Sequence, residues 1–435
     1  MPPQPDNGLQ HPLPERYITD PGLATGGRLK QRPTDFIVEE IPLYGPSGEG
    51  EHLYVHIEKI SRPTLEVVRE IADRFGVQHY EVGYAGMKDK HAVTRQWISV
   101  RSPRNDAVAR LGDLEGVQVL DARRHRNKLR VGHLRGNRFT IRIREVRGDD
   151  VRRAADTARA VLATLERCGV PNFVGEQRFG FRMNNHEVGR LYLQQDWAGM
   201  CRLLLGEPDP VSPADYQARL AFENGDPRQA AKLWPRSQRL EWTVANELAD
   251  GASRREAILS TSNTMRRFLI SAFQSAVFNH VLARRIDEQL FDCLVEGDVA
   301  IKHDNLAVFH VGLAEAADAT THERCQRLEI SASGPMWGHD MVRTTGRPER
   351  IELECLRDTG VQIADFQTPP HDVKGLRRPL RQPVTEVDVA HGVDDHGPFA
   401  QLRFVLPRGA FATTVLREVM KWASREHPWG TIDEE

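Results

Sequence analysis

The chain has 435 residues and a formal net charge of −2, with 40% hydrophobic and 28% charged residues. This composition is typical of a globular protein with a large core, and the length favours more than one domain. It contains no long apolar run, which argues against a membrane span, and its five cysteines lie far apart in the sequence, which favours reduced thiols in the cytoplasm over a metal site or disulfides.

Residues 1–27 begin with a polar, proline-rich stretch that lacks the pattern of a signal peptide, and we expect them to form a disordered leader. Strands are expected over residues 35–43 and 52–60, because apolar and polar side chains alternate in the second of these segments. A helix capped by Thr64 is expected over residues 64–75. Short strands at 83–86 and 93–100 then flank a polar turn.

Further along the chain, a strand is expected over residues 138–144, followed by a helix from Asp149 or Asp150 to about Gly169. Helical patterns dominate after residue 184, most clearly over 266–286, whereas residues 303–378 give no clear pattern. A strand over 401–406 and a helix over 413–424 close the chain. This order predicts an α+β catalytic domain built from both ends of the chain, with a second domain inserted between them.

The segment GYAGMKDKHAVTRQW places Asp89 between Lys88 and Lys90, with Arg95 close by. Neighbouring cations favour an ionised carboxylate, which a nucleophile or a group that stabilises a cationic sugar requires. A turn between two strands would expose this carboxylate at the edge of a rigid scaffold. From charge and turn logic alone, however, a solvated turn that closes a hairpin is the favoured interpretation.

Residues 123–144 hold nine arginines or lysines and no acidic residue. Arg142 and Arg144 lie on one face of the expected strand, where such side chains could bind RNA phosphates. Phe139, two residues after Asn137, offers a surface on which an unpaired base could stack. The alternative is a solvent-facing strand with a buried phenylalanine.

Two other segments combine glycines with aromatic residues. VPNFVGEQRFG (170–180) is interpreted mainly as structural packing, because glycines allow close backbone approach. LPRGAFATTVLRE (406–418) predicts a strand, a turn and a helix start, where backbone N–H groups could bind an anion. Phe411 lies in that turn, and a core position is equally open. Motifs for ATP, dinucleotides, zinc and a serine triad are missing from the sequence.

Taken together, these segments resemble the TruD family of tRNA pseudouridine synthases. The resemblance is carried by GRLKQRPTDFIVEE (27–40), GYAGMKDKHAVTRQW (83–97), GHLRGNRF (132–139), VPNFVGEQRFG (170–180) and LPRGAFATTVLRE (406–418), with SAFQSAVFNHVLARR (271–285) as a weaker sixth. Val174 departs from the family, which often has an aromatic residue there. The resemblance implies isomerisation of a uridine to pseudouridine in tRNA, at uridine 13, by a V-shaped, two-domain molecule.

The resemblance also assigns roles to single residues. It implies that Asp89 is the catalytic nucleophile, that Lys30 lies near it, and that Asn137, Phe139 and Phe411 contact the substrate. Asp89 would attack the sugar or remove a proton from it to give a glycal. A non-catalytic RNA-binding protein and an Asp-dependent glycosidase are the alternatives, although glycosidases usually need paired carboxylates.

The expected fold is therefore α+β, with a mixed, largely antiparallel sheet catalytic domain of the pseudouridine synthase type and an inserted, helix-rich α/β domain. We expect a leader at 1–27, the first part of the catalytic domain at 28–183, the inserted domain at 184–378 and the C-terminal part of the catalytic domain at 379–435. The expected partner is tRNA, with no membrane, no cofactor and no metal, and the expected state is a cytoplasmic monomer.

Overall fold

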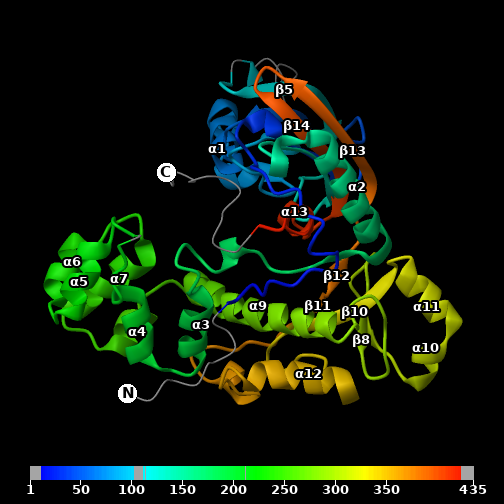
Figure 1. The fold of residues 1–435 in the computed structure, drawn as a ribbon. Coiled ribbons are helices and arrows are strands. Elements are labelled where there is room, and N and C mark those ends of the chain that lie inside the picture. The colour runs from blue at the N-terminus through cyan, green and yellow to red at the C-terminus, as the bar shows by residue number, and fades with distance from the viewer. Residues whose placement is uncertain (1–10, 102–110, 113, 211, 423–435) are drawn as a thin grey trace. The chain divides into compact units, whose positions relative to one another are not determined.

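A computed structural model describes residues 11–101, 111–112, 114–210 and 212–422, and the chain forms two compact units (Figure 1). Unit 1 comprises Met1–Arg16 and Phe173–Leu380, and unit 2 comprises Tyr17–Asn172 and Arg381–Glu435. The chain therefore passes between the units after residues 172 and 380, rather than at 183/184 and 378/379 as the sequence suggested. Both ends of the chain nevertheless contribute to unit 2.

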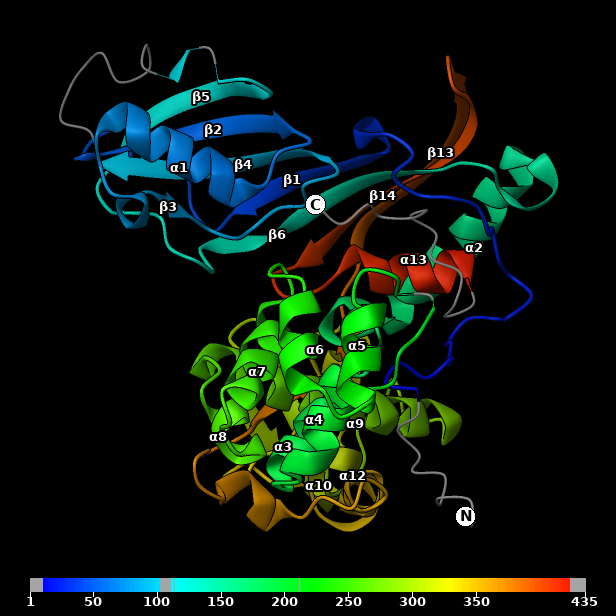
Figure 2. The same cartoon turned by 90° about the vertical axis from the view of Figure 1, so that its left-hand side faces the viewer.

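Unit 2 is built on one sheet of eight strands, whose bounds are β1 Phe36–Pro42, β2 His52–Ile60, β3 Gly83–Tyr84, β4 Val93–Arg101, β5 Val117–His125, β6 Leu134–Ile143, β13 Thr385–Asp394 and β14 Gly397–Pro407. The strand order is β13-β14-β6-β1-β4-β2-β5, with β3 paired to β4 (Figure 2). Among the strand pairs that the structure describes in this sheet, only β1–β4 is parallel. The expected mixed, largely antiparallel sheet is confirmed.

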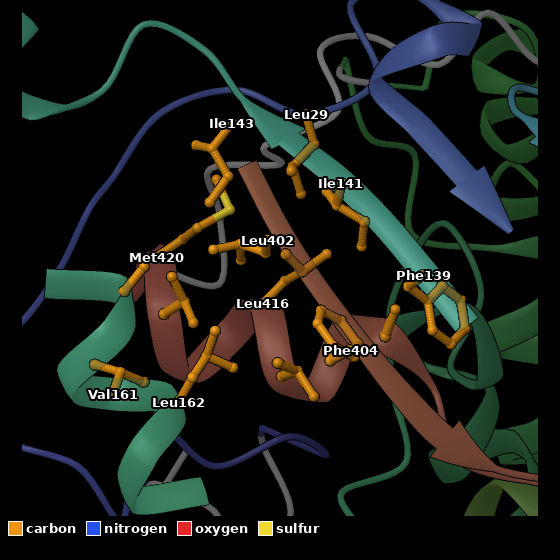
Figure 3. Close-up of a cluster of buried hydrophobic side chains, with 14 of the residues drawn as sticks. Leu29, Phe139, Ile141, Ile143, Val161, Leu162, Leu402, Phe404, Leu416 and Met420 are labelled. Carbon is orange, nitrogen blue, oxygen red and sulfur yellow. The ribbon is translucent and has the colours of Figure 1, made fainter. Parts of the chain in front are cut away.

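Three helices cover this sheet: α1 Thr64–Phe75, α2 Val151–Cys168 and α13 Ala412–Met420. The apolar face of α1 packs against inward-pointing residues of β2 and β4, such as Val55 and Ile98. A larger cluster joins α2 and α13 to β6 and β14, where alternate residues of each strand point toward the helices (Figure 3). This second cluster contains Phe139, and it packs under the start of β6 and the end of β14, near the predicted site residues Asn137 and Phe411.

Several expected elements match the structure closely, because their periodic patterns are strong. β2 and α1 have the expected bounds, although Pro63 is the N-cap and Thr64 is the first helical residue. Asp150 caps α2 by accepting a hydrogen bond from the Arg153 N–H. α13 ends at Met420, before the expected end at 424, and residues 423 and 424 lie outside the described residues. β5 and β13 were not expected, because few of their side chains are buried.

Residues 11–27 differ from the loose leader that the sequence suggested. The Glu418 carboxylate accepts hydrogen bonds from the Ile18 N–H and from the Thr19 N–H and hydroxyl. Thr25 is buried, and its N–H donates to the carbonyl of Val419. Residues 18–25 are therefore bound to α13 through side-chain and backbone hydrogen bonds, which their composition alone did not indicate.

Unit 1 is rich in helices and is organised around the long helix α9, Asn263–Asp287. A four-stranded antiparallel sheet in the order β11-β10-β8-β9 packs nearby, and part of it lies in the region without a clear pattern. Its strands are β8 Val299–Lys302, β9 Val308–His310, β10 Ile330–Met336 and β11 Leu376–Pro379. Its other helices are α3 Asn185–Leu193, α4 Trp197–Leu205, α5 Tyr216–Glu223, α6 Pro227–Leu233, α7 Arg239–Ala249, α8 Arg254–Leu259, α10 Leu313–Ala317, α11 Ala319–Gln326 and α12 Gly346–Arg357. Among the described helices of the whole chain, none is both long and apolar enough to cross a membrane.

Candidate active site

Asp89 lies in the turn between β3 and β4, before the start of an interior strand of the unit 2 sheet, with 43% of its side chain exposed. The Lys30 ammonium donates a hydrogen bond of 3.0 Å to the Asp89 carboxylate. Lys30 has a φ of 52°, a left-handed conformation that is uncommon outside glycine and that clusters at functional sites. The two residues that the family resemblance placed together are thus in direct contact.

A second lysine, which the sequence analysis missed, holds the backbone of Asp89. Lys59 is fully buried, and its ammonium donates to the carbonyl of Asp89 at 2.8 Å and to that of Arg62 at 2.5 Å. Burial lowers the pKa of Lys59 to about 8, although the negative charge of Asp89 opposes this shift. The alternation in β2 could have identified this lysine, because Lys59 follows Val55 and Ile57 at the positions whose side chains point inward.

The residue before Asp89 is also anchored. Lys88 forms a buried ion pair of 2.9 Å with Glu40 of β1, and its N–H donates to the Thr64 hydroxyl at 3.0 Å. Burial raises the pKa of Glu40, and the charge of Lys88 partly offsets this effect. Lys88 therefore points into the protein and fixes the turn, leaving the Asp89 carboxylate as the group that faces outward beside Lys30.

Aromatic rings lie next to this ion pair. The Lys30 ammonium lies 4.4 Å from the centroid of the Phe36 ring, a cation–π contact, and Phe36 meets Phe139 edge-on at 6.3 Å. Phe139 also stacks on Phe404 at 5.5 Å, and Figure 3 shows the two rings side by side. Only 7% of Phe139 is exposed, so its ring is core packing beside the site rather than the open stacking surface suggested by the sequence.

Asn137 belongs to β6 and lies opposite Glu40 of β1 and Leu406 of β14. The preceding Gly136 leaves no room for a Cβ atom beside the Leu406 carbonyl, which explains a glycine at this point of the GNRF segment, a stretch of β6 rather than a turn. The side-chain oxygen of Asn137 is buried and accepts no hydrogen bond within the described residues. A buried acceptor without a donor costs free energy.

Phe411 differs from Phe139 in being accessible. It is the N-cap residue of α13, directly after the turn that follows β14, and half of it is exposed. Its carbonyl accepts a hydrogen bond from the Thr414 hydroxyl, which fixes the turn. Of the two phenylalanines predicted to contact substrate, Phe411 is the one that presents a ring to solvent.

The arginines of β6 are not the unopposed phosphate ligands that the sequence suggested. Arg144 is buried and forms ion pairs with Asp35 at 2.7 Å and with Asp394 at 2.6 Å. Arg142 pairs with Asp394 at 3.0 Å, and these arginines hold the pKa of Asp394 well below its usual range. Residues 123–144 contain no acidic residue, but Asp35 and Asp394, from other segments of unit 2, neutralise these arginines. Arg144 therefore has a structural role.

The arrangement can present one carboxylate to a ligand. Lys30 and Lys59 place positive charge on two sides of Asp89, one at its carboxylate and one at its backbone. A positioned carboxylate can act as a nucleophile or as a base. Within the described part of the chain, no three His, Cys, Asp or Glu side chains are grouped so that they could hold a metal ion.

Comparison with known proteins bears directly on this site. The pattern of the family described as tRNA pseudouridine synthase D (TruD) matches residues 14–419. The chain belongs to this family. The resemblance seen in the separate sequence motifs is thereby confirmed, and the TruD match extends through both units.

Individual relatives agree over similar lengths. A tRNA pseudouridine synthase D from Geotalea daltonii is 43% identical over 408 residues, which cover 93% of this chain and 99% of the relative. One from Thermus thermophilus is 37% identical over 416 residues, 95% of each chain. A TruD crystal structure from Methanosarcina mazei has a TM-score of 0.79 at 27% identity and covers 94% of this chain and 96% of its own. The α+β fold is therefore shared with a solved TruD structure.

Proposed function

We propose that this protein isomerises one uridine of tRNA to pseudouridine, that uridine 13 is the target, and that Asp89 is the catalytic carboxylate. The observation that carries the proposal is the contact between the Lys30 ammonium and the Asp89 carboxylate. Lys59 holds the same turn through a hydrogen bond to the Asp89 carbonyl. It occurs in a chain that matches TruD proteins over almost its whole length. Five free cysteines are consistent with action in the cytoplasm.

The proposed reaction needs no external reagent. The bond between uracil N1 and the sugar carbon C1′ breaks, the uracil turns, and its C5 forms a bond to the same carbon, while C5 loses a proton and N1 gains one. Asp89 either attacks C1′ to form an ester that breaks when C5 bonds to C1′, or removes the proton from C2′ to give a glycal and returns it when C5 bonds to C1′. In both routes Lys30 holds the carboxylate in place before the sugar arrives, which reduces the reorganisation needed during the reaction.

The base must leave its stack to reach Asp89, at a cost of about a few kcal/mol. We assign Phe411 as the ring on which it stacks, since its ring is half exposed, and such stacking returns ~1–3 kcal/mol. Asn137 is assigned to the substrate from the family resemblance, and its buried side-chain oxygen must become accessible before a donor group of the substrate can reach it. Phe139 supports the site through Phe36, the ring beneath the Lys30 ammonium.

The experiment is to incubate purified protein with unmodified tRNA, without cofactor or metal, and to map pseudouridine at single-nucleotide resolution. We expect one new pseudouridine, at position 13, formed by the wild type and not by Asp89→Asn, which should still bind tRNA. Modification at another position would refute the assignment of uridine 13 alone. Tight tRNA binding without any isomerisation would refute the enzymatic role and favour a non-catalytic RNA-binding protein.

A further inference from the structure

Three exposed arginines lie where β6 begins and β14 ends, at the same edge of unit 2 as Asn137. Arg130 precedes β6, Arg135 is its second residue, and Arg408 directly follows β14. None of them forms an ion pair with any residue that the structure describes, in contrast to Arg142 near the end of β6 and Arg144 directly after it. Cations without acids beside them favour an anionic partner.

Hydrogen bonds join the segments that carry these arginines into one surface. The Gly132 N–H donates to the carbonyl of Ala85 at 2.8 Å, which ties the segment before β6 to the approach to the catalytic turn. The Arg408 N–H donates to the carbonyl of Arg135 at 3.1 Å, and its guanidinium donates to that of Gly132 at 3.2 Å. The arginines therefore sit on a connected rim, next to the turn that holds Asp89.

Apolar side chains are exposed in the segment before β6, in the turn after β14 and in the turn that holds Asp89. Met87 lies two residues before Asp89 and is 70% exposed, and Val131 is 73% exposed. Phe411 follows Arg408 by three residues and is also accessible. Cations interleaved with apolar and aromatic groups match an unpaired nucleic acid strand, whose phosphates need positive charge and whose bases need flat or apolar contacts.

We propose that Arg130, Arg135 and Arg408, with Met87 and Val131, form a binding site for the single-stranded RNA on either side of the target uridine. The arginines bind phosphates of the flanking nucleotides, and the two apolar side chains contact their bases. We call this surface the arginine rim. The proposal rests on the proposed function, because it places the RNA strand beside Asp89, and it replaces Arg144 as a phosphate ligand.

The test measures tRNA binding over a range of salt concentrations with the Asp89→Asn protein, so that turnover does not interfere. We expect the pair Arg135→Gln and Arg408→Gln to weaken binding and to lower the slope of log affinity against log salt by ~0.7–0.9 for each lost contact. Since all these side chains are exposed, melting temperatures should be unchanged.

The matched control is the pair Arg152→Gln and Arg153→Gln. Both arginines are exposed, lie in the first turn of α2, and pair with no acid among the described residues. They follow the other end of β6, a ten-residue strand that spans about 30 Å at ~3.3 Å per residue. The control removes the same charge, so an equal loss of slope in both pairs would overturn the arginine rim as a local site.

A crosslinking measurement separates this inference from the proposed function. Val131→p-benzoylphenylalanine, irradiated with tRNA, should crosslink to nucleotides adjacent to the modified uridine. A crosslink confined to distant nucleotides, or none in a protein that still binds tRNA, would overturn the rim. If the wild type bound and crosslinked tRNA but formed no pseudouridine, the proposed activity would fail while the RNA site stood.

Discussion

At the scale of single residues, the unusual feature is a buried ammonium group that no described carboxylate contacts directly. Lys59 is fully buried, and its described hydrogen bonds go to the backbone carbonyls of Asp89 and Arg62 rather than to a carboxylate. Placing a cation in such a position is costly, which is why its pKa is lowered to about 8. A cost of this kind beside the turn that we propose to be catalytic leads us to infer that Lys59 serves to position Asp89.

We expect Lys59→Met to lower kcat by about ten- to hundredfold with little change in tRNA affinity, because small displacements of a reacting group reduce rates strongly. The measurement is single-turnover kinetics together with a binding titration, well below the melting temperature. Lys421→Met is the matched control, since Lys421 also donates to a backbone carbonyl, that of Glu418, but lies at the far end of α13. Equal kcat values for Lys59→Met and the wild type would show that Lys59 only stabilises the fold.

The same lysine predicts a dependence of stability on pH. Its folded pKa of about 8 lies below the ordinary value of 10.5, so between these values the unfolded chain binds more protons than the folded one. The contribution of Lys59 to the free energy of unfolding should therefore rise as pH increases from about 8 to 10.5. Urea unfolding across this range should show that the free energy of unfolding of the wild type rises relative to that of Lys59→Met. A constant difference between the two would contradict the prediction.

At the scale of elements, β6 has two different faces. Phe139, Ile141 and Ile143 point toward α2 and α13 in the core, whereas Arg142 and Arg144 point to the opposite face and pair with acids. The strand thus buries a guanidinium as well as apolar groups. Because Asp35 is also buried, the Arg144 pair belongs to the packing of the sheet.

We expect Arg144→Gln to lower the free energy of unfolding by about 3–5 kcal/mol, since removing one partner leaves a buried carboxylate uncompensated. Arg142→Gln should cost less, because Arg142 is more exposed and Asp394 keeps its pair with Arg144. Chemical denaturation of both variants measures this difference. A normal stability of Arg144→Gln combined with a reduced salt slope for tRNA binding would instead restore Arg144 as a phosphate ligand.

At the scale of the whole molecule, unit 2 is assembled from two segments distant in sequence. The short strands β7 Val170–Pro171 and β12 Arg381–Gln382 pair antiparallel, with Pro171 opposite Arg381. The points where the chain leaves and re-enters unit 2 are therefore neighbours. Each unit also has its own internal packing, as expected for an inserted domain.

We expect a shortened chain, with residues 17–172 joined to 381–435 through a brief Gly/Ser linker, to fold cooperatively. Neighbouring residues in an antiparallel pair are only about 5 Å apart, so a few residues can bridge the junction. Thermal unfolding followed by circular dichroism measures the transition. A chain without a cooperative transition would show that unit 2 depends on unit 1 for its stability.

The sequence by itself determined the elements with strong periodicity and the family resemblance of the Asp89 turn. β2 and α1 follow from alternating and helical apolar patterns, and Asp89 was predicted to be catalytic from the resemblance of a short motif whose residues are adjacent in the chain. These features depend on neighbouring residues, so they can be read without the fold. Only the tertiary structure decided the partners of charged groups: Lys59 beneath Asp89, Glu40 with Lys88, and acids that neutralise Arg144. Such contacts join residues far apart in sequence, and burial sets their energies, so no local pattern contains them.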